Sequence, residues 1–343
     1  MSDHQLLLFN YVMDEKHPLL SHQAEAAIAL ARKFDKVTVI TGKVGFCDLP
    51  ENVNVISSNW VDGQPIFSAF RFIRTAISEV IRNPYDSVFF HMTDVQCALM
   101  SPYFRFKKKK QALWYAHTYK SNYLRFSSFW VNFLITSTKG SIPINSLKVK
   151  AIGQAIDSTK FQPLPFEQVN LSRLIHIGRF DKSKNIDLLI SESKKLRKTY
   201  PELQLRIIGS TANHESIEWA NIIKSEGQFD ADWLYFHEGI SRSEFPTYMR
   251  DNGVFFHAYT GSLDKTLIEA TFLRAPVVTI NPAYLEIFGS WSNVSNPSLK
   301  MEYESLRSLD NSSINLELER RLALAIESHS LDHWTDRIFE ILQ

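Results

Sequence analysis

Short apolar runs alternate with helical segments along this chain, and this alternation limits the possible folds more than any other feature of the sequence. Apolar runs that end in small or polar residues predict strands, and apolar residues at helical spacing between them predict helices. Strands that alternate with helices favour a parallel, doubly wound sheet, so the expected fold class is α/β. In the first half, the predicted strands are 6–13, 36–41, 87–91, 112–116, 133–137 and 148–152, and the predicted helices are 24–33 and 67–82.

The length of the chain predicts two domains. At 343 residues it exceeds what one ordinary hydrophobic core encloses. The segment 158–170 contains Pro163 and Pro165 and shows little periodicity, so it is predicted as a linker between residues 1–157 and residues 171–325. The alternation resumes at Leu174, and residues 326–343 end in an amphipathic helix.

Composition and charge exclude several classes of protein. The formal net charge of +1 gives no overall attraction to nucleic acid, and we expect no nucleic-acid partner. Cys47 and Cys97 lie far apart, which argues against a disulfide scaffold or a zinc site and fits a reducing compartment. The run that starts at Leu6 is too short for a signal peptide, and no run approaches the roughly 18 apolar residues that span a membrane. We therefore expect a cytoplasmic protein.

A polar turn between two apolar runs, 254–258 and 275–280, predicts a binding site for an anion. A helix that starts in this turn would offer unpaired backbone N–H groups and the positive end of its dipole, both of which favour phosphate. Glu269 follows a little over one helical turn later and could reach a ribose hydroxyl of the same ligand. The alternative is an ordinary turn with Glu269 as a solvated helix residue. The turn residues are Gly261, Ser262, Leu263, Asp264 and Lys265.

A second predicted strand, 174–177, is followed by Gly178 and Arg179, and a loop then leads to Lys184. An arginine offers a planar fork for phosphate oxygens and a lysine offers a compact charge. Together Arg179 and Lys184 could neutralise a diphosphate leaving group. The alternative is two solvated surface cations.

The order of these pieces resembles a known family. Gly-Arg-x4-Lys at 178–184, the run 205–210, the segment 236–239 and the helix start 267–270 are similar to the C-terminal half of retaining glycosyltransferases of family 4, of the bacterial surface-glycan type. The resemblance covers roughly residues 172–282, and the segments 113–117 and 152–157 fit the N-terminal half more loosely. It implies the GT-B fold, in which two Rossmann-like doubly wound domains face a central cleft.

The resemblance also implies roles for individual residues. Arg179 and Lys184 would stabilise the leaving group, and Glu269 would contact the nucleotide ribose. The family signature has a first glutamate, near the donor sugar, that is separated from the second by seven residues, and this chain has Gly261 there instead. The expected donor-binding residues are Gly178, Gly209, Gly239, Gly261, Ser262, Leu263, Asp264, Lys265 and Glu269.

His117 is the candidate catalytic residue of the first half. It follows the apolar run 113–116, so it is expected at the carboxyl end of a strand, where open α/β sheets bind ligands. The resemblance places a histidine here beside the donor sugar, and the alternative is a histidine that caps a helix or packs in the core. His91 also ends an apolar run, and for this residue packing is the preferred interpretation.

Two charged segments have competing interpretations. Asp230-Ala231-Asp232 has the spacing of a metal-binding motif, but it precedes a strand rather than following one, and we interpret it as a polar turn. The basic run 105–110 lies near aromatic residues, which fits either an anionic membrane surface or a solvated loop over a domain core. RNA binding is a third option that no known motif supports. The nearby aromatic residues are Tyr119, Tyr123, Phe126, Phe129 and Trp130.

The function implied by the resemblance is transfer of a sugar, with retention, from a UDP- or GDP-linked donor to a glycan or lipid-linked glycan acceptor in surface polysaccharide synthesis. The enzyme would be hexosyltransferase-like, and with Arg179, Lys184 and the helix start carrying the diphosphate it would need no metal and no cofactor. Peripheral contact with the inner face of the cytoplasmic membrane is part of this hypothesis. Two alternatives stay open, a non-catalytic GT-B-like protein that binds a nucleotide sugar or glycan, and a two-domain sugar-phosphate isomerase.

Overall fold

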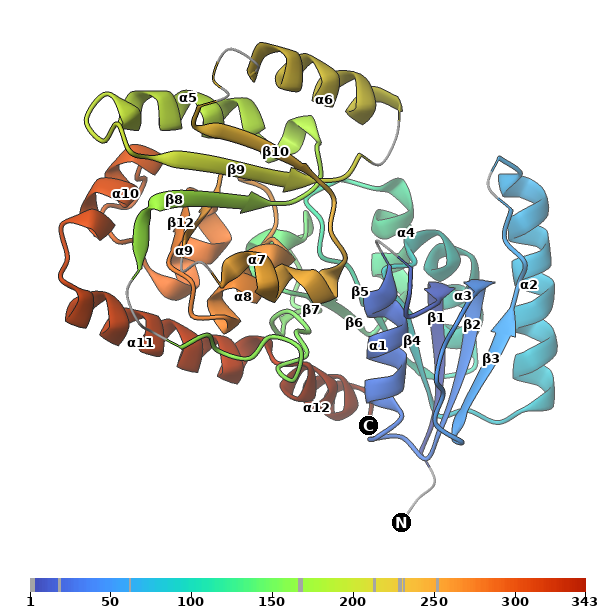
Figure 1. The fold of residues 1–343 in the computed structure, drawn as a ribbon. Coiled ribbons are helices and arrows are strands. Elements are labelled where there is room, and N and C mark those ends of the chain that lie inside the picture. The colour runs from blue at the N-terminus through green and yellow to red at the C-terminus, as the bar shows by residue number, and fades with distance from the viewer. Residues whose placement is uncertain are drawn as a thin grey trace. The chain divides into compact units, whose positions relative to one another are not determined.

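The structure is a computed structural model that describes residues 4–17, 20–61, 63–165, 169–211, 214–227, 230, 232–250 and 253–343. The chain divides into two compact units, Ile156–Ser330 and a unit made of Met1–Ala155 with Leu331–Gln343. Each unit contains one parallel sheet (Figure 1). The predicted linker 158–170 groups with the second unit, although its residues 166–168 lie outside the described residues. The C-terminal helix groups with the first unit.

The first unit is built on a seven-stranded sheet of order β3-β2-β1-β4-β5-β6-β7, in which every pairing is parallel. Side chains alternate along its strands, so Leu6 and Leu8 enter one core cluster while Leu7 and Phe9 enter another. A sheet buried on both faces produces the continuous apolar runs seen in the sequence. The strands are β1 (Gln5–Met13), β2 (Lys36–Val44), β3 (Val53–Ser57), β4 (Ser87–His91), β5 (Lys110–Trp114), β6 (Phe133–Thr136) and β7 (Val149–Ala151).

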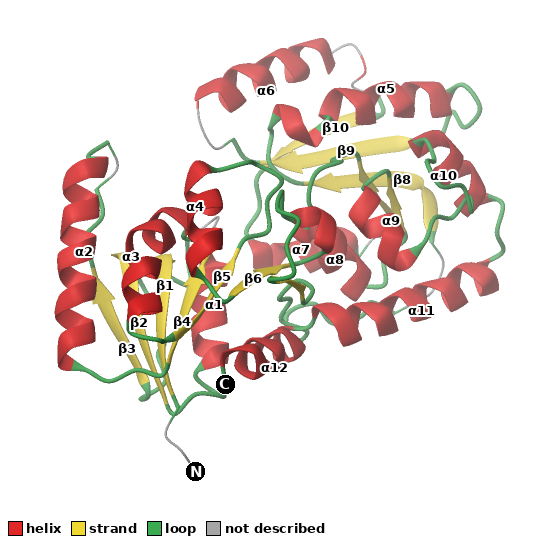
Figure 2. Ribbon diagram, turned by 180° about the vertical axis from the view of Figure 1, so that it is seen from behind, coloured by secondary structure: helices red, strands yellow, loops and turns green. Residues whose placement is uncertain are grey.

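Helices cover both faces of this sheet. Side chains of α1 (Ser21–Leu30) and α12 (Leu331–Leu342) share one core cluster. Side chains of α2 (Pro65–Arg82), α3 (Asp94–Phe106) and α4 (Asn122–Trp130) share the cluster on the other face. A short 3-10 helix, η1 (Lys139–Ser141), follows β6. Figure 2 shows α2 standing beside β3 at the edge of the sheet.

The second unit has a five-stranded parallel sheet of order β10-β9-β8-β11-β12. Its strands are β8 (Asn170–Ile177), β9 (Gln204–Gly209), β10 (Leu234–Glu238), β11 (Gly253–His257) and β12 (Val277–Thr279). Its helices are η2 (Lys182–Lys184), α5 (Ile186–Arg197), α6 (His214–Gly227), η4 (Arg242–Glu244), α7 (Phe245–Met249), α8 (Lys265–Phe272), α9 (Pro282–Phe288), α10 (Leu299–Arg307) and α11 (Asn311–His329). These elements confirm the predicted α/β class with doubly wound sheets.

The strand order of the second sheet creates a switch point beside β8. From β8 the chain continues to β9 and β10 on one side, and it later returns to β11 on the other side of β8. Segments that leave β8 and β11 therefore diverge at the carboxyl edge of the sheet, where open α/β sheets bind their ligands. Both segments that the sequence singled out, 178–184 and 259–269, start at this point.

In the first unit, the sequence prediction missed β3, α3 and α4. Helix α3 contains Pro102, directly after Ser101. A proline is unfavourable inside an isolated helix, but α3 buries Cys97, Met100 and Phe104 in the core, and this packing outweighs the local preference. No helix in the described ranges is both long enough and apolar enough to cross a membrane.

Candidate functional site

The segment after β8 presents two exposed cations, Arg179 and Lys182, beside an ionised carboxylate. Gly178 and Arg179 follow the strand, and the Arg179 side chain is exposed. Asp181 caps η2, and its carboxylate accepts hydrogen bonds from the Ser183 backbone N at 2.9 Å and from Ser183 Oγ at 2.6 Å. The side-chain bond from Ser183 lowers the pKa of Asp181 most, and the nearby charges of Arg179 and Lys184 lower it further. Arg179 is therefore positioned to meet an anion from solvent.

Three glycines at the strand ends are closely packed, and a Cβ atom on the first, Gly178, would lie 3.0 Å from His176 Nε2. A Cβ atom on Gly209 would lie 2.2 Å from the carbonyl oxygen of Gly178, and one on Gly239 would lie 2.6 Å from the Cβ of Ser210. The ends of β8, β9 and β10 approach too closely for any larger residue. Ligand contact by these glycines stays a prediction, because close backbone packing already accounts for them.

Lys184 is a buried ion-pair residue rather than a solvated cation. It is 8% exposed, and its Nζ atom pairs with Asp264 Oδ2 across the switch point. The same Nζ atom lies 4.1 Å from the centre of the Tyr259 ring. Asn185, in a left-handed conformation with φ 51°, donates from Nδ2 to the carbonyl oxygen of Ala258 at 3.0 Å. These contacts join the segment after β8 to the segment after β11.

The predicted anion site at the start of α8 contains a carboxylate of its own. Asp264 caps this helix, and its Oδ1 atom accepts a hydrogen bond from the Thr266 backbone N at 3.4 Å. Its Oδ2 atom lies 3.2 Å from His257 Nε2 in addition to pairing with Lys184. Burial alone would raise the pKa of Asp264, but Lys184 and His257 outweigh it and hold this pKa well below its usual value. An incoming anion therefore meets the Lys184–Asp264 pair instead of a bare helix terminus.

A buried polar chain extends from Asp264 to the end of β12. Burial lowers the pKa of His257, so its imidazole is neutral, and its Nε2–H donates to the acceptor-only carboxylate of Asp264. The other ring nitrogen, Nδ1, therefore accepts a hydrogen bond from Thr279 Oγ1 at 3.1 Å, and Thr279 Oγ1 in turn accepts from the Asn281 backbone N at 3.1 Å. Asn281 Nδ2 lies within hydrogen-bonding distance of three carbonyl oxygens of the polar turn, those of Tyr259, Gly261 and Ser262.

The sequence analysis missed His257, Thr279 and Asn281, although one signal for Asn281 was present. Asn281 follows an apolar run and precedes Pro282, which is typical of a helix N-cap, and it does cap α9. His257 gave no such signal, because it lies inside an apolar run as a buried strand residue. His257, Thr279 and Asn281 form a buried hydrogen-bonded chain that fixes the position of the polar turn.

The space beside Gly261 is occupied by the side chain of Tyr259. A Cβ atom on Gly261 would lie 2.1 Å from the Tyr259 hydroxyl, and this hydroxyl is 3.4 Å from Ser262 Oγ. A glutamate at position 261 would therefore require Tyr259 to move. Leu263 is 2% exposed and belongs to the core, so only its backbone is available to a ligand. Lys265 is the first residue of α8.

Glu269 is a buried ion-pair residue, so the alternative of a solvated helix residue is wrong. Its side chain is 5% exposed, and its Oε1 atom accepts a hydrogen bond from Arg242 Nε at 2.6 Å. Arg242 comes from η4, which follows β10, and its guanidinium lies 5.3 Å from the centre of the Phe161 ring. Contact of Glu269 with a ribose stays a prediction, and Arg242 is the partner that the sequence analysis missed.

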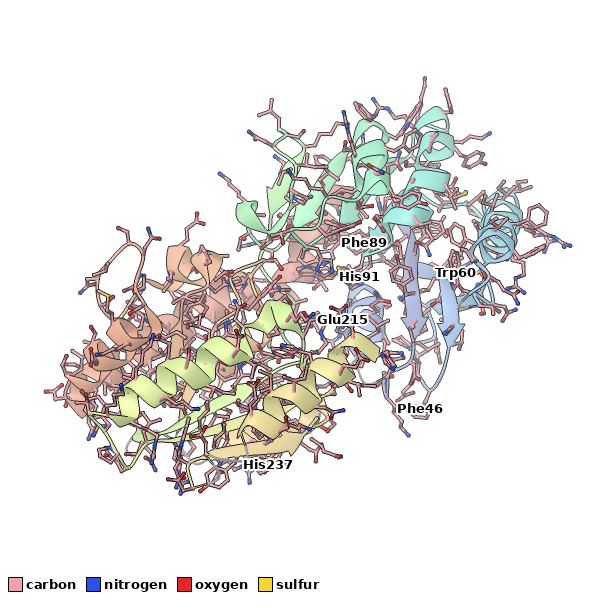
Figure 3. The ribbon with its side chains drawn as sticks, turned by 90° about the horizontal axis from the view of Figure 1, so that it is seen from above. Phe46, Trp60, Phe89, His91, Glu215 and His237 are labelled. Carbon is pink, nitrogen blue, oxygen red and sulfur yellow. The ribbon has the colours of Figure 1, made fainter. Side chains whose placement is uncertain are left out.

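The two histidines of the first unit that the sequence analysis considered, His117 and His91, occupy different environments. His117 is exposed just past β5, as the sequence predicts, and its ring lies 5.7 Å from that of Tyr115. His91 projects from β4 together with Phe89 (Figure 3), is buried, and lies 5.8 Å from the ring of Phe89 and 5.7 Å from that of Trp334. Packing accounts for His91, whereas a catalytic role of His117 stays a prediction.

The acidic pair before β10 is held by cations of α5. Asp230 lies 2.6 Å from Lys194 Nζ, and Asp232 lies 3.2 Å from Arg197 Nη2, while residue 231 lies outside the described residues. Across the described part of the chain, no group of three or more His, Cys, Asp or Glu side chains is arranged to hold a metal ion. The carboxylates of the pair are thus explained by ion pairs within the fold.

Comparison with known sequences identifies the domain that contains this site. Residues 160–294 match the profile of the family described as Glycosyl transferases group 1, a segment that contains all five strands of the second sheet. This match lies within the second unit, Ile156–Ser330. No curated protein sequence matches this chain.

Solved structures with the same fold include three bacterial proteins. HepE from Anabaena, in complex with UDP and glucose, superposes with a TM-score of 0.73 at 14% identity over 98% of both chains. A glycosyltransferase from Rickettsia africae gives 0.73 at 13% identity over 100% of this chain and 98% of that one. A UDP-forming trehalose-phosphate synthase from Burkholderia xenovorans gives 0.70 at 11% identity over 99% and 100%. The chain has the GT-B fold, and the group 1 domain within this fold supports a glycosyltransferase.

Proposed function

We propose that this protein is a retaining glycosyltransferase that moves a hexose-type sugar from a nucleotide-diphosphate donor to a glycan or lipid-linked glycan in surface polysaccharide synthesis. The observation that supports this most is the convergence of charged residues at the switch point of the group 1 domain. Arg179 and Lys184 follow β8 and Arg242 follows β10, and these cations meet the carboxylates Asp264 and Glu269 of the segment after β11 or lie beside them. The Anabaena protein binds UDP, which makes a UDP-linked sugar the first donor to test.

The proposed chemistry depends on stabilising the charge of the departing diphosphate. Electrostatic stabilisation of the charge that develops in the transition state is usually the largest single contribution that an enzyme makes to the rate. Arg179 is exposed and offers a fork of donors to phosphate oxygens. The Lys184 ammonium has three N–H donors, so it can keep its bond to Asp264 and still donate to a phosphate. Backbone amides of Ser262 to Lys265 and the carboxylate of Glu269 would complete the donor site.

We further propose that transfer needs neither a metal ion nor a cofactor. Protein cations would carry the charge that a divalent ion carries in other transferases. The sugar would pass through an oxocarbenium-like state and be attacked on the face from which the nucleoside diphosphate departs. His117, in the first unit, is proposed to contact the sugar.

The test compares Arg179→Ala with Lys182→Ala. Lys182 lies in the same segment, is exposed, and pairs only at the surface with Glu215, so it is a matched control. Arg179→Ala should lower kcat/KM with UDP-sugars by about a hundredfold, which corresponds to the loss of about 2.7 kcal/mol of transition-state stabilisation. Lys182→Ala should stay within about twofold of the parent. Transfer by Arg179→Ala at the parental rate would refute this site assignment.

A second function is favoured by one observation, the absence of a carboxylate at position 261. Tyr259 fills the adjacent space, so the chain could retain a nucleotide sugar without activating it. This alternative is a non-catalytic GT-B-like protein that binds a nucleotide sugar or glycan. Donor binding measured by thermal shift, combined with neither hydrolysis nor transfer in the presence of candidate acceptors, would support it over the transferase.

Membrane contact through the basic run is a further part of the proposal. Lys107 and Lys108 are exposed, whereas Lys109 donates to the Tyr85 carbonyl oxygen and is tied to the fold. The ring of Trp130 lies 6.0 Å from that of Phe106 and 6.1 Å from that of Phe126, so cations and exposed aromatics do occur together here. This arrangement suits the inner face of an anionic membrane, where a lipid-linked acceptor would be found.

A further inference from the structure

Helix α2 exposes an apolar stripe that the fold of its unit does not use. One side of the helix buries Phe72 and Ala76 in the core, as expected for a helix that covers a sheet. The other side carries large apolar residues whose exposure ranges from 38% for Ile77 to 81% for Ile66. The exposed apolar residues are Ile66, Phe67, Phe70, Ile77 and Ile81.

These residues form one continuous band along the helix. Each residue of an α-helix advances by about 100°, so the five side chains fall within an arc of roughly 100° bounded by Ile66 and Phe67. The band extends from the first turn to the last. Figures 1 and 2 both show α2 at the outer edge of its sheet, beside β3. A contiguous apolar band on an outer helix is typical of a surface that binds a protein or a membrane.

The charges around the band point to an anionic partner. The helix carries Arg71, Arg74 and Arg82 against a single acid, Glu79. Arg74 and Arg82 are exposed, and helical spacing puts Arg74 within the apolar band itself. The Glu79 carboxylate accepts a hydrogen bond from Asn83 Nδ2 at 2.8 Å. Phenylalanine and isoleucine beside arginine are the pattern of a helix that lies in the interface of an anionic bilayer.

The same charges disfavour a second copy of the chain as the partner. In a symmetric dimer the same patch faces itself, so Arg74 of each copy would face the arginines of the other. Lipid phosphates instead offer an acceptor to each guanidinium while the acyl chains take the aromatic side chains.

We propose that α2 is an interfacial helix that docks on an anionic membrane surface, with Phe67, Phe70 and Ile81 entering the boundary between headgroups and acyl chains. Arg74 and Arg82 contact the lipid phosphates. This surface does not depend on the transferase proposal, and it differs from the Lys107–Lys108 hypothesis because its main contribution is apolar. Binding through α2 should therefore persist partly at high salt, whereas a purely electrostatic contact disappears.

The experiment measures co-sedimentation of the full chain with phosphatidylcholine vesicles that contain or lack phosphatidylglycerol. The test variant is Phe67→Ser/Phe70→Ser/Ile81→Ser. The matched control is Ile217→Ser/Ile222→Ser, which removes exposed apolar side chains from α6 in the other unit. We expect the α2 variant to bind anionic vesicles at least about tenfold more weakly, and the control to bind like the parent. Circular dichroism and turnover of a soluble acceptor should be unchanged in both, because the substituted side chains are exposed and lie outside the donor site.

A second readout places the helix in the lipid directly. The emission of Phe67→Trp minus that of the parent, which removes the signal of the seven native tryptophans, should be blue-shifted with anionic vesicles and keep part of this shift at about 0.5 M salt. Equal vesicle binding by the α2 variant and the parent would overturn the proposal, and so would an unshifted emission. A parent that is dimeric and ignores vesicles, with an α2 variant that becomes monomeric, would overturn it in favour of self-association.

Discussion

Replacement of Lys184 by methionine tests whether the buried pair at the switch point stabilises the second unit. Lys184→Met keeps the length of the side chain and removes its charge, so that the Asp264 carboxylate keeps only His257 as a charged or polar side-chain partner among those described. Removing one member of a buried ion pair costs about 3–5 kcal/mol, because the remaining charge is left uncompensated. The two side chains are 11% and 14% exposed and His257 still donates, so we expect the lower end, about 3 kcal/mol.

A double-mutant cycle separates this pairing from other effects of the substitution. Asp264→Asn retains an oxygen that can cap Thr266, so it removes the charge while keeping the N-cap of α8. We expect it to cost about 2 kcal/mol alone, and the double variant to cost about 3 kcal/mol. The coupling energy between the two positions would then be about 2 kcal/mol, within the range of contacting residues.

The assay is urea unfolding near neutral pH, combined with hydrogen exchange of peptides from β11 and α8. Exchange is needed because two compact units need not unfold in one transition. Lys182→Met is the control, since its pair with Glu215 is exposed and should contribute less than about 0.5 kcal/mol. Additive costs in the cycle, or equal costs for the Lys184 and Lys182 variants, would refute the reasoning.

Three further predictions concern pH, metal and salt. Burial lowers the pKa of His176 to about 3, so between about pH 3 and pH 6.5 the unfolded chain binds a proton at this residue that the folded chain does not bind. The free energy of unfolding should then fall by up to about 1.4 kcal/mol per pH unit between these values, and urea titrations of His176→Asn should show a shallower fall. EDTA should leave transfer unchanged, and a loss restored by Mg²⁺ or Mn²⁺ would revive Asp230 and Asp232 as ligands. Lys107→Gln/Lys108→Gln should weaken binding to anionic vesicles at low salt and hardly at all at about 0.5 M, whereas salt-independent weakening would contradict an electrostatic contact.

The alternation of strands with helices was readable from the sequence, because each strand is marked by a short apolar run. Leu6 to Phe9 form a continuous apolar run because successive side chains enter cores on opposite faces of the sheet, and a parallel sheet covered by helices needs such runs. The ends of these runs also located the strand ends after which Gly178 and Asp264 lie. Local periodicity and backbone chemistry determine these features, and both are present in any short window of the sequence.

The partners of the charged site residues were decided by the tertiary structure alone. Lys184 and Asp264 are 80 residues apart, and Arg242 and Glu269 are 27 apart. Each pair forms because the strand order places the segments after β8, β10 and β11 at one edge of the sheet. Periodicity does not encode strand order, so the sequence left Arg179 and Lys184 as phosphate-binding or solvated cations and gave no sign that Lys184 is buried in an ion pair with Asp264.

In α2, too, the sequence determined one feature and the tertiary structure another. Phe70 and Phe72 are equally apolar in the sequence, and both were expected in an amphipathic helix. The fold buries Phe72 against the sheet and leaves Phe70 exposed. A helix at the surface of a sheet packs only one of its sides against the sheet, so the apolar residues on its other side meet solvent. The sequence determined that α2 is a helix with apolar residues on more than one side, and the packing of the unit determined which of them meet solvent.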